Sequence, residues 1–263
     1  MQLADYARDW AVITGASSGI GREFAAQLAS AGLNVILVAR RKPLLDELAA
    51  ELIKSCNVQA RVVVLDLARA GAAAELRASL SAERCKVRLL CNNAAFGQWG
   101  RFEKASLEAY QRMIQVNVSA MVALCHTFLP DLATFPTSVV INVSSAAAYQ
   151  PVPYMAVYAA TKAFVHSFSQ AIHGEWSEHG VLVQTLIPGP TESEFDALAG
   201  AYPSALTSRG SAAQVVRDSL THLRTNKPVA LSAKGTFKQR LFAGLFPPTV
   251  VIREVAKRFV PPE

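Results

Sequence analysis

The chain has 263 residues, of which 51% are hydrophobic and 17% are charged, and its formal net charge is +6. This length suits one large α/β domain and is too short for two. The sequence has no eighteen consecutive apolar residues, and Met1 to Asp9 carries acids where a signal peptide has basic and apolar residues, so we expect a cytoplasmic protein.

Short apolar runs of strand length alternate with helical patterns along the whole chain. The runs cover residues 10–14, 34–38, 60–65, 87–91, 138–143, 181–187 and 228–232. This alternation predicts an α/β fold with a doubly wound parallel sheet of about seven strands and helices on both faces. Ligands of such sheets bind beyond the carboxyl ends of the strands.

A glycine-rich turn follows the first apolar run. Its candidate phosphate-binding residues are Gly15, Ser17, Ser18, Gly19, Ile20 and Gly21. Glycines let a backbone approach a phosphate closely, and the start of the helix that follows offers free N–H groups to an anion. The spacing is Gly-x-x-x-Gly-x-Gly, which differs from the commonest dinucleotide pattern, and a tight turn can use the same residues for geometry alone.

The second apolar run ends in Ala39, Arg40 and Arg41. In an NAD enzyme a carboxylate at this place holds the adenosine ribose. Two guanidinium groups suit a ribose that carries a 2′-phosphate, so we expect NADP(H) as the cofactor. The alternative is that both arginines belong to the solvated start of a helix.

A hydroxyl and a Tyr-x-x-x-Lys pair follow the fifth run. Ser145 lies thirteen residues before Tyr158, and Lys162 lies four residues after it. On a helix Tyr158 and Lys162 share one face, so the ammonium favours the ionised phenol and the pair can transfer a proton. Tyr-x-x-x-Lys alone also occurs on many amphipathic helices.

Together these motifs make the chain resemble the short-chain dehydrogenases/reductases over nearly its whole length. The matching segments are Thr14–Gly21, Asp66–Leu67, Asn92–Ala94, Val116–Val118, Ser144–Ser145, Tyr158–Lys162 and Pro188–Gly189. The resemblance implies a single-domain Rossmann fold over residues 1–263. It implies that Tyr158 is the catalytic acid/base, that Ser145 orients the substrate carbonyl, that Lys162 binds the nicotinamide ribose and lowers the pKa of the tyrosine, and that Asn117 holds a water.

The resemblance also implies further cofactor contacts. Asp66 and Leu67 are expected at the adenine, Asn93 and Ala94 in the central sheet near the cofactor, and Pro188, Gly189 and Thr191 at the nicotinamide end.

Residues 191–210 have weak periodicity and many small side chains, which is typical of a substrate lid. The expected pocket residues are Val152, Tyr154, Met155, Phe195, Leu198, Tyr202 and Leu206. These side chains suit a lipophilic or acyl substrate better than a sugar, although ordinary core packing explains them equally well.

The C-terminal part is basic. Residues 209–258 hold ten Lys or Arg against two acids, and in the extension 233–263 apolar side chains lie between the cations. A solvated face is the usual explanation of such a run. The alternatives are a peripheral contact with an anionic membrane and a contact with an acidic carrier protein or coenzyme A. No nucleic-acid-binding module accompanies the charge.

The long apolar helices expected at 106–129 and 154–178 commonly form a homodimer or homotetramer interface in the family resembled. The four cysteines, at positions 56, 85, 91 and 125, have no Cys-x-x-Cys spacing, so we expect reduced thiols and no metal site.

The leading hypothesis is an NADPH-dependent enzyme that reduces a ketone or aldehyde, or oxidises the alcohol, with Tyr158 as general acid/base. One alternative is a catalytically silent NADP-binding regulator or scaffold, which has no need of the complete set Asn117, Ser145, Tyr158 and Lys162. Another is an epimerase or dehydratase, which the chain length fits poorly.

Overall fold

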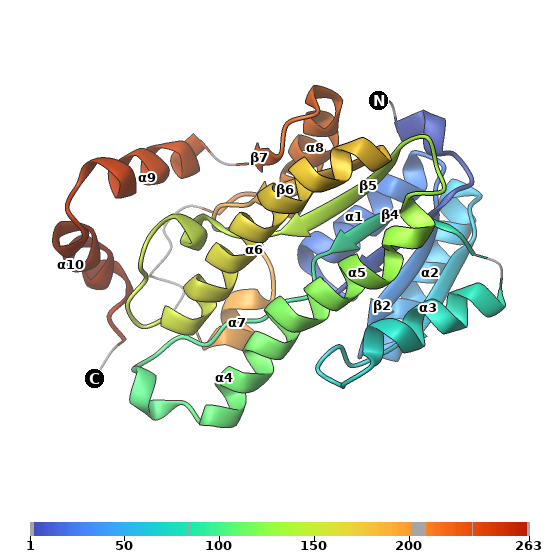
Figure 1. Ribbon diagram of the computed structural model, residues 1–263. Coiled ribbons are helices and arrows are strands. Elements are labelled where there is room, and N and C mark those ends of the chain that lie inside the picture. The colour runs from blue at the N-terminus through green and yellow to red at the C-terminus, as the bar shows by residue number, and fades with distance from the viewer. Residues whose placement is uncertain (1–2, 84, 201–208, 233, 262–263) are drawn as a thin grey trace.

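The computed structural model describes residues 3–83, 85–200, 209–232 and 234–261 (Figure 1). At its centre is a parallel sheet of seven strands in the order β3-β2-β1-β4-β5-β6-β7. The strands are β1 Trp10–Thr14, β2 Asn34–Ala39, β3 Ala60–Val64, β4 Val87–Asn92, β5 Ser138–Val143, β6 Val181–Ile187 and β7 Val229–Leu231. Every predicted run is a strand, and the bounds differ by at most one residue. The predicted doubly wound α/β sheet is confirmed.

Ten α-helices lie in the described part of the chain. They are α1 Gly19–Ser30, α2 Lys42–Cys56, α3 Ala72–Ala82, α4 Leu107–Ile114, α5 Met121–Leu132, α6 Ala156–Trp176, α7 Phe195–Ala199, α8 Ala212–His222, α9 Lys234–Leu245 and α10 Pro248–Phe259. The helix expected at 106–129 lies in one continuous helical segment, Leu107–Leu132, in which the π-helical turn Gln115–Ala120 stands between α4 and α5. The helix expected at 154–178 is α6.

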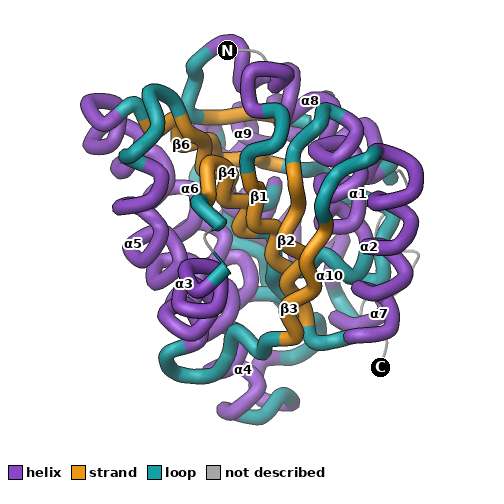
Figure 2. Tube along the Cα trace, turned by 90° about the vertical axis from the view of Figure 1, so that its right-hand side faces the viewer, coloured by secondary structure: helices purple, strands orange, loops and turns teal. Residues whose placement is uncertain are grey.

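The sheet is covered on both faces because neighbouring residues of each buried strand point in opposite directions. Buried residues of α1, α2 and α8 pack on one face, and those of α3, α5 and α6 pack on the other. Helices flank the sheet on both sides in Figure 2. In β1, Ile13 belongs to the first cluster and Val12 to the second, and both are fully buried.

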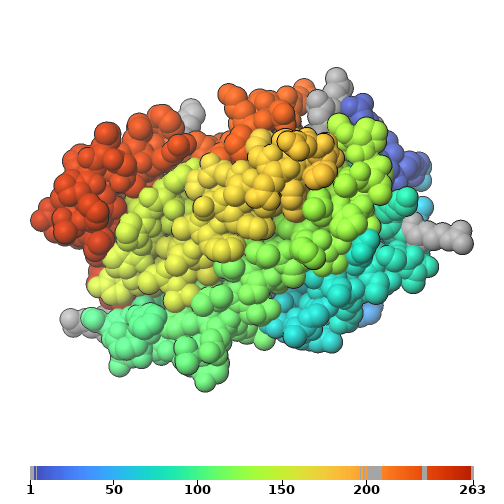
Figure 3. Space-filling view, viewed as in Figure 1, coloured from blue at the N-terminus to red at the C-terminus, as the bar shows by residue number. Residues whose placement is uncertain are grey.

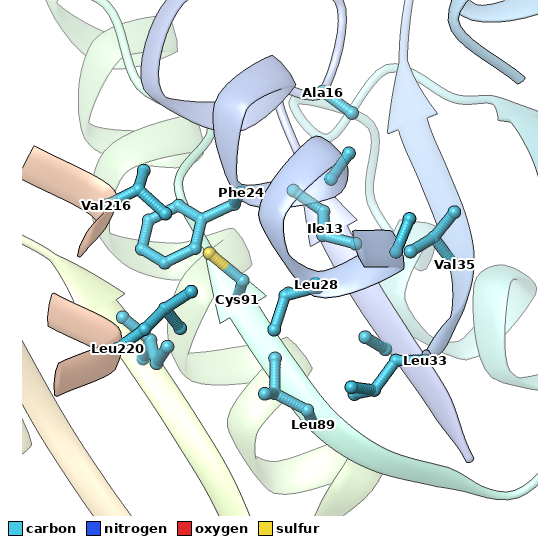
Figure 4. Packing of buried hydrophobic residues seen from close by; sticks show 14 of the residues in the cluster. Ile13, Ala16, Phe24, Leu28, Leu33, Val35, Leu89, Cys91, Val216 and Leu220 are labelled. Atoms are coloured by element: carbon cyan, nitrogen blue, oxygen red, sulfur yellow. The ribbon is translucent and has the colours of Figure 1, made fainter. Parts of the chain in front are cut away.

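Figure 4 shows the packing on the α1 face. Phe24 and Leu28 of α1 lie between the strand residues Ile13 and Leu89 and Val216 of α8. Full burial of one such side chain stabilises the fold by about 1.5–3 kcal/mol. This packing fixes the start of α1, and therefore the glycine turn, against the sheet.

The strand order reverses at β1, which has β2 on one side and β4 on the other. Successive connections therefore leave β1 and β4 in opposite directions, and a crevice forms beyond their carboxyl ends. Gly15, Asn93 and Ser145 all follow directly from strand ends at this edge or lie within two residues of them.

The stretch Leu107–Leu132 is the one described helical segment long and apolar enough to cross a membrane, by length and composition alone. Its buried residues, among them Leu124 and Phe128, pack in the cluster shared with α3 and α6. The stretch thus forms a covering layer of this sheet, with its other side exposed.

Helices α9 and α10 form a ridge at one end of the molecule, beyond the sheet (Figures 1 and 3). They make up most of the region predicted as a basic and apolar extension.

Candidate active site

The turn between β1 and α1 forms a cradle open to an anion. Gly15 and Gly19 have φ values of 68° and 53°, in the left-handed region that favours glycine. Ser18 is the N-cap of α1 but its side chain makes no capping hydrogen bond, so the N–H groups of the first turn remain available. A Cβ added at Gly21 would overlap the carbonyl oxygen of Gly15. The predicted residues Gly15 to Gly21 therefore form one compact turn.

A hydrogen-bonded junction, which sequence reasoning missed, joins this cradle to β4. The Thr14 hydroxyl accepts the N–H groups of Asn93 and Ala94, both at 3.0 Å, and donates to the carbonyl of Cys91. The Asn93 amide donates to the carbonyl of Thr14 at 2.9 Å. Asn93 and Ala94 thus join β4 to the cradle.

The end of β2 places one of its two arginines on the cradle. Arg41 donates to the Ser17 hydroxyl, from Nη2 at 3.0 Å, and its Nη2 forms an ion pair of 2.7 Å with Glu194. Arg40 is exposed. Glu194 was not among the predicted residues, and it lies 153 positions from Arg41 in the sequence. The hydrogen bonds from Arg41 and Ser18 lower the pKa of Glu194, so the carboxylate is charged at neutral pH.

Asp66, expected at the adenine, is held by an unpredicted partner from α4. Its Oδ2 pairs with Arg112 at 2.6 Å, and its Oδ1 accepts the Ala68 N–H at 3.0 Å. Partial burial opposes ionisation, but these two contacts outweigh it and lower the pKa of Asp66. The neighbouring Leu67 is buried. This arrangement links the β3 end to α4 at the adenine side of the crevice.

Ser145 follows the end of β5 and begins the short helix η4, Ala146–Tyr149. Its Oγ accepts the Ala147 N–H at 3.1 Å, and the Ala146 N–H donates to the carbonyl of Pro188 at 3.0 Å. The Ser144 hydroxyl donates to the Lys162 carbonyl at 2.7 Å. The β5 end is thereby fastened to both α6 and the β6 end.

Lys162 and Tyr158 share one buried face of α6, as the spacing predicts. The Lys162 Nζ donates to the carbonyl of Val143 at 2.9 Å and lies 5.8 Å from the centre of the Tyr158 ring. Burial lowers the pKa of Lys162 to about 8. At neutral pH a buried positive charge therefore lies beside the phenol.

Asn117 lies in the π-helical turn Gln115–Ala120 and is buried. Its Nδ2 donates to Thr161 Oγ1 at 3.1 Å and to the Phe96 carbonyl at 3.0 Å, and its Oδ1 accepts the Phe96 N–H at 3.1 Å. Both hydrogens of the Asn117 amide are used in these bonds, so they do not donate to the water that this residue was expected to hold. The side chain ties α6 to the chain after β4.

A cavity of about 10 Å³ lies between this turn and Lys162. Its lining includes Val116, Asn117, Val143 and Lys162. That volume is near the minimum needed for one water molecule.

An apolar cluster covers the substrate side of Tyr158. It contains the predicted residues Val152, Met155 and Phe195. The Phe195 and Tyr158 ring centres are 5.1 Å apart. Tyr154 is half-buried with a φ of 67° and lies outside this cluster. Tyr202, Leu206 and the side chain of Leu198 lie outside the described residues.

The C-terminal helices complete this cluster, which sequence reasoning did not foresee. Val251 and Val255 of α10 are buried in it, and Trp99, Phe242 and Phe259 pack against it. The Trp99 indole donates to the Phe259 carbonyl at 2.8 Å.

The predicted lid, residues 191–210, has a closed base. Thr191 pairs with Gly210 as an isolated bridge, and the Thr191 hydroxyl donates to the Gly189 carbonyl at 2.9 Å. Its first part includes α7, and an added Cβ at Gly19 would lie 3.1 Å from the Cβ of Ser193. Pro188 to Thr191 thus bring the lid over the cradle.

The residues at this edge fit a dinucleotide. The cradle offers N–H groups without a side-chain cap, and Arg41 contacts its Ser17. The buried Lys162 and Tyr158 lie at the same edge of the sheet.

Comparison with known proteins agrees with this geometry. The family model for short chain dehydrogenase matches residues 9–201. The chain belongs to the short-chain dehydrogenase family.

Two relatives of similar identity to this chain carry names that differ in the activity they state. The very-long-chain 3-oxoacyl-CoA reductase of Anas platyrhynchos is 33% identical over 184 residues, which cover 68% of this chain and 58% of that protein. The inactive hydroxysteroid dehydrogenase-like protein 1 of Pongo abelii is 31% identical over 190 residues, covering 71% of this chain and 56% of that protein. The matched segment thus spans less than two thirds of the length of these curated relatives.

A solved short-chain dehydrogenase from Sphingobium yanoikuyae, in complex with NADPH, is 29% identical and has a TM-score of 0.81. The match covers 91% of this chain and 96% of that one. The bound NADPH in that relative agrees with the predicted cofactor.

Proposed function

We propose that the protein is an NADP(H)-dependent oxidoreductase that reduces a ketone or aldehyde to an alcohol, and catalyses the reverse oxidation, with Tyr158 as general acid/base. One observation carries the proposal. The buried Lys162 ammonium lies 5.8 Å from the Tyr158 ring centre, at the sheet edge that also holds the glycine cradle. A buried cation beside a phenol attracts the negative charge of the phenolate, so the pair suits proton transfer.

The glycine cradle and Arg41 would hold NADPH, which would supply a hydride for the carbonyl carbon. The chain supplies the rest. The Ser145 hydroxyl, whose oxygen already accepts the Ala147 N–H, donates its hydrogen to the substrate oxygen and orients it. Tyr158 donates its proton to the same oxygen as negative charge develops there. The Lys162 charge stabilises the phenolate that remains.

Proton return to Tyr158 is assigned to the cavity beside Lys162. A water there contacts Lys162 and the π-helical turn, and Asn117 keeps that turn in place through its bonds to Phe96 and Thr161. Asn117 is therefore a positioning residue.

The cofactor is assigned as NADP(H) because the β2 end has Arg40 and Arg41 and no carboxylate. A 2′-phosphate would replace Glu194 as the anionic partner of Arg41. The NADPH-bound relative supports the assignment. Measured kcat/KM should favour NADPH over NADH, and a preference for NADH would overturn this choice.

The substrate is assigned to lipophilic carbonyl compounds, including acyl thioesters. Val152, Met155, Phe195 and residues of α10 form an apolar cluster with Tyr158, which we assign as the substrate wall. The relatives named as 3-oxoacyl-CoA reductases support an acyl substrate. A panel of ketones, aldehydes and 3-oxoacyl thioesters, followed by NADPH absorbance, tests this assignment.

Replacement of Tyr158 by Phe tests the mechanism. The rate should fall by about 10²–10⁴, the range for loss of a positioned acid or base, while NADPH binding persists. Tyr110→Phe is the matched control, because Tyr110 packs against the same cluster but its hydroxyl donates to the Phe102 carbonyl. A Tyr158→Phe enzyme with wild-type turnover would refute the role of the phenol.

The competing function is a catalytically silent NADP-binding regulator. The relative named as inactive favours it. Binding of NADPH without turnover of any compound in the panel would establish this alternative.

Two further assignments concern the setting of the protein. Exposed apolar side chains on α4 and α6, among them Ile114 and Phe164, which stacks on the partly buried Phe168, suit a homodimer or homotetramer interface. Four unpaired cysteines suit a reducing compartment such as the cytoplasm. Sedimentation analysis and fractionation of cells test these assignments.

A further inference from the structure

Helix α9 exposes its apolar side chains to solvent. Phe237, Leu241 and Leu245 are 54%, 46% and 76% exposed. They lie four residues apart, so they form one stripe along the helix. Phe246 follows the stripe and is also exposed. Contiguous exposed apolar side chains rimmed by polar ones mark an interaction surface.

The opposite side of α9 already has its partner. Thr236 is buried, and Gln239 donates to the carbonyl of Ala146 in η4 at 3.1 Å. Phe242 packs against the cluster around Tyr158. The helix therefore cannot bury its stripe by turning inward, and the stripe stays exposed. Helices α9 and α10 form the ridge at one end of the molecule (Figures 1 and 3).

The ridge is strongly basic. Residues 234–260 contain six Lys or Arg and one acid, a formal charge of +5 out of +6 for the whole chain. The acid, Glu254, already pairs with Lys257 at 2.8 Å and Arg253 at 3.5 Å. On α9, Lys238 lies next to the stripe and is exposed.

The exposed apolar stripe and the positive charge of the ridge together indicate the kind of partner. A second copy docked ridge to ridge would bring two surfaces of charge +5 together, which is unfavourable. An acidic protein would satisfy the cations but gives no reason for a protruding row of Phe and Leu. An anionic bilayer accepts both, since its headgroups attract the cations and the boundary of its acyl chains accepts the apolar side chains.

We propose that the α9–α10 ridge docks this protein on an anionic membrane surface, with Phe237, Leu241 and Leu245 inserted at the headgroup boundary and the exposed Lys238 and Arg258 on the phosphates. The inner sides of the same helices line the apolar cluster around Tyr158. The docked enzyme would therefore hold its substrate side next to the membrane. The position of the substrate side next to the membrane depends on the function proposed above. The docking on the membrane does not depend on that function.

The test is flotation of the full chain with vesicles of phosphatidylcholine alone or with 30% phosphatidylserine. We expect the protein to bind the anionic vesicles. Its affinity for the neutral vesicles should be at least tenfold lower, and 0.5 M salt should lower its affinity for the anionic vesicles at least tenfold. Phe237→Ser/Leu241→Ser/Leu245→Ser and, separately, Lys238→Glu/Arg258→Glu should each weaken the binding at least tenfold.

Ile53→Ser is the matched control, because this side chain is 49% exposed on α2, apart from the ridge and from the proposed oligomer interface on α4 and α6. Its binding should equal that of the wild type. The proposal is overturned if the wild type does not bind anionic vesicles, if the stripe variant binds as well as the control, or if the stripe variant changes the oligomeric state instead. Turnover of a water-soluble ketone by the stripe variant should stay at the wild-type level, which separates a failure of docking from a failure of the proposed chemistry.

Discussion

Replacing Lys162 with Met should stabilise the fold while it abolishes activity. The ordinary lysine pKa of 10.5 falls to about 8 here because the side chain is buried. Holding the charge in the fold at pH 7 therefore destabilises the protein by about 3 kcal/mol. Methionine fills a similar volume without charge, and loss of the hydrogen bond to the Val143 carbonyl costs about 1 kcal/mol. The expected net gain is about 2 kcal/mol.

The pH dependence follows from the direction of the pKa change. Below pH 8 the lysine is protonated in both states and the full penalty applies. Between pH 8 and 10.5 the folded protein releases the proton while the unfolded chain keeps it, so the wild type gains stability as pH rises. The stability advantage of the Lys162→Met variant should shrink across this range.

The measurement is denaturant unfolding of both proteins at pH 7 and at pH 10, supported by thermal unfolding at pH 7. A gain of about 2 kcal/mol corresponds to roughly 4–8 °C in Tm for a chain of this size. Lys86→Met is the control, because Lys86 is exposed. The reasoning fails if Lys162→Met is no more stable than the wild type at pH 7, or if the difference between the two is the same at both pH values.

Two further changes test the cradle and its lid. Gly21→Ala should lower stability by about 1–3 kcal/mol and raise the KM for NADPH, because the new methyl group overlaps the Gly15 carbonyl. Gly174→Ala is the control. Nothing lies within 4 Å of the methyl group added there, so this change should not destabilise the fold. Glu194→Gln should lower the KM for NADPH by up to about fivefold, since the half-exposed carboxylate competes with a 2′-phosphate for Arg41. The KM for NADH should not change, and an equal change for both cofactors would show that the carboxylate acts on the lid alone.

The strands could be predicted from the sequence because the sheet is buried on both faces. In β5 all six residues are buried, so the apolar run and the strand have the same bounds. The glycine turn and the Tyr158–Lys162 pair were also predictable, because each depends on residues close together in the chain. Local spacing fixes both the turn and the shared helix face.

The contacts that sequence reasoning missed join distant segments. Glu194 meets Arg41 across 153 positions, and the Trp99 indole meets the Phe259 carbonyl across 160. No local pattern encodes these pairs, because they depend on how the lid and α10 fold back over the sheet edge. The π-helical turn was missed for another reason: the apolar periodicity of residues 106–129 continues through it.

The C-terminal helices connect the two proposals. The inner side of α10 packs Val251 and Val255 into the substrate wall, while the outer side of α9 carries the exposed stripe. Deleting the whole region would therefore open the substrate wall and remove the membrane surface together, and loss of activity after such a deletion would not distinguish the two roles. Only substitutions on the outer side leave the wall intact. Substitutions on the outer side of α9 therefore test the proposed membrane docking separately from the proposed turnover.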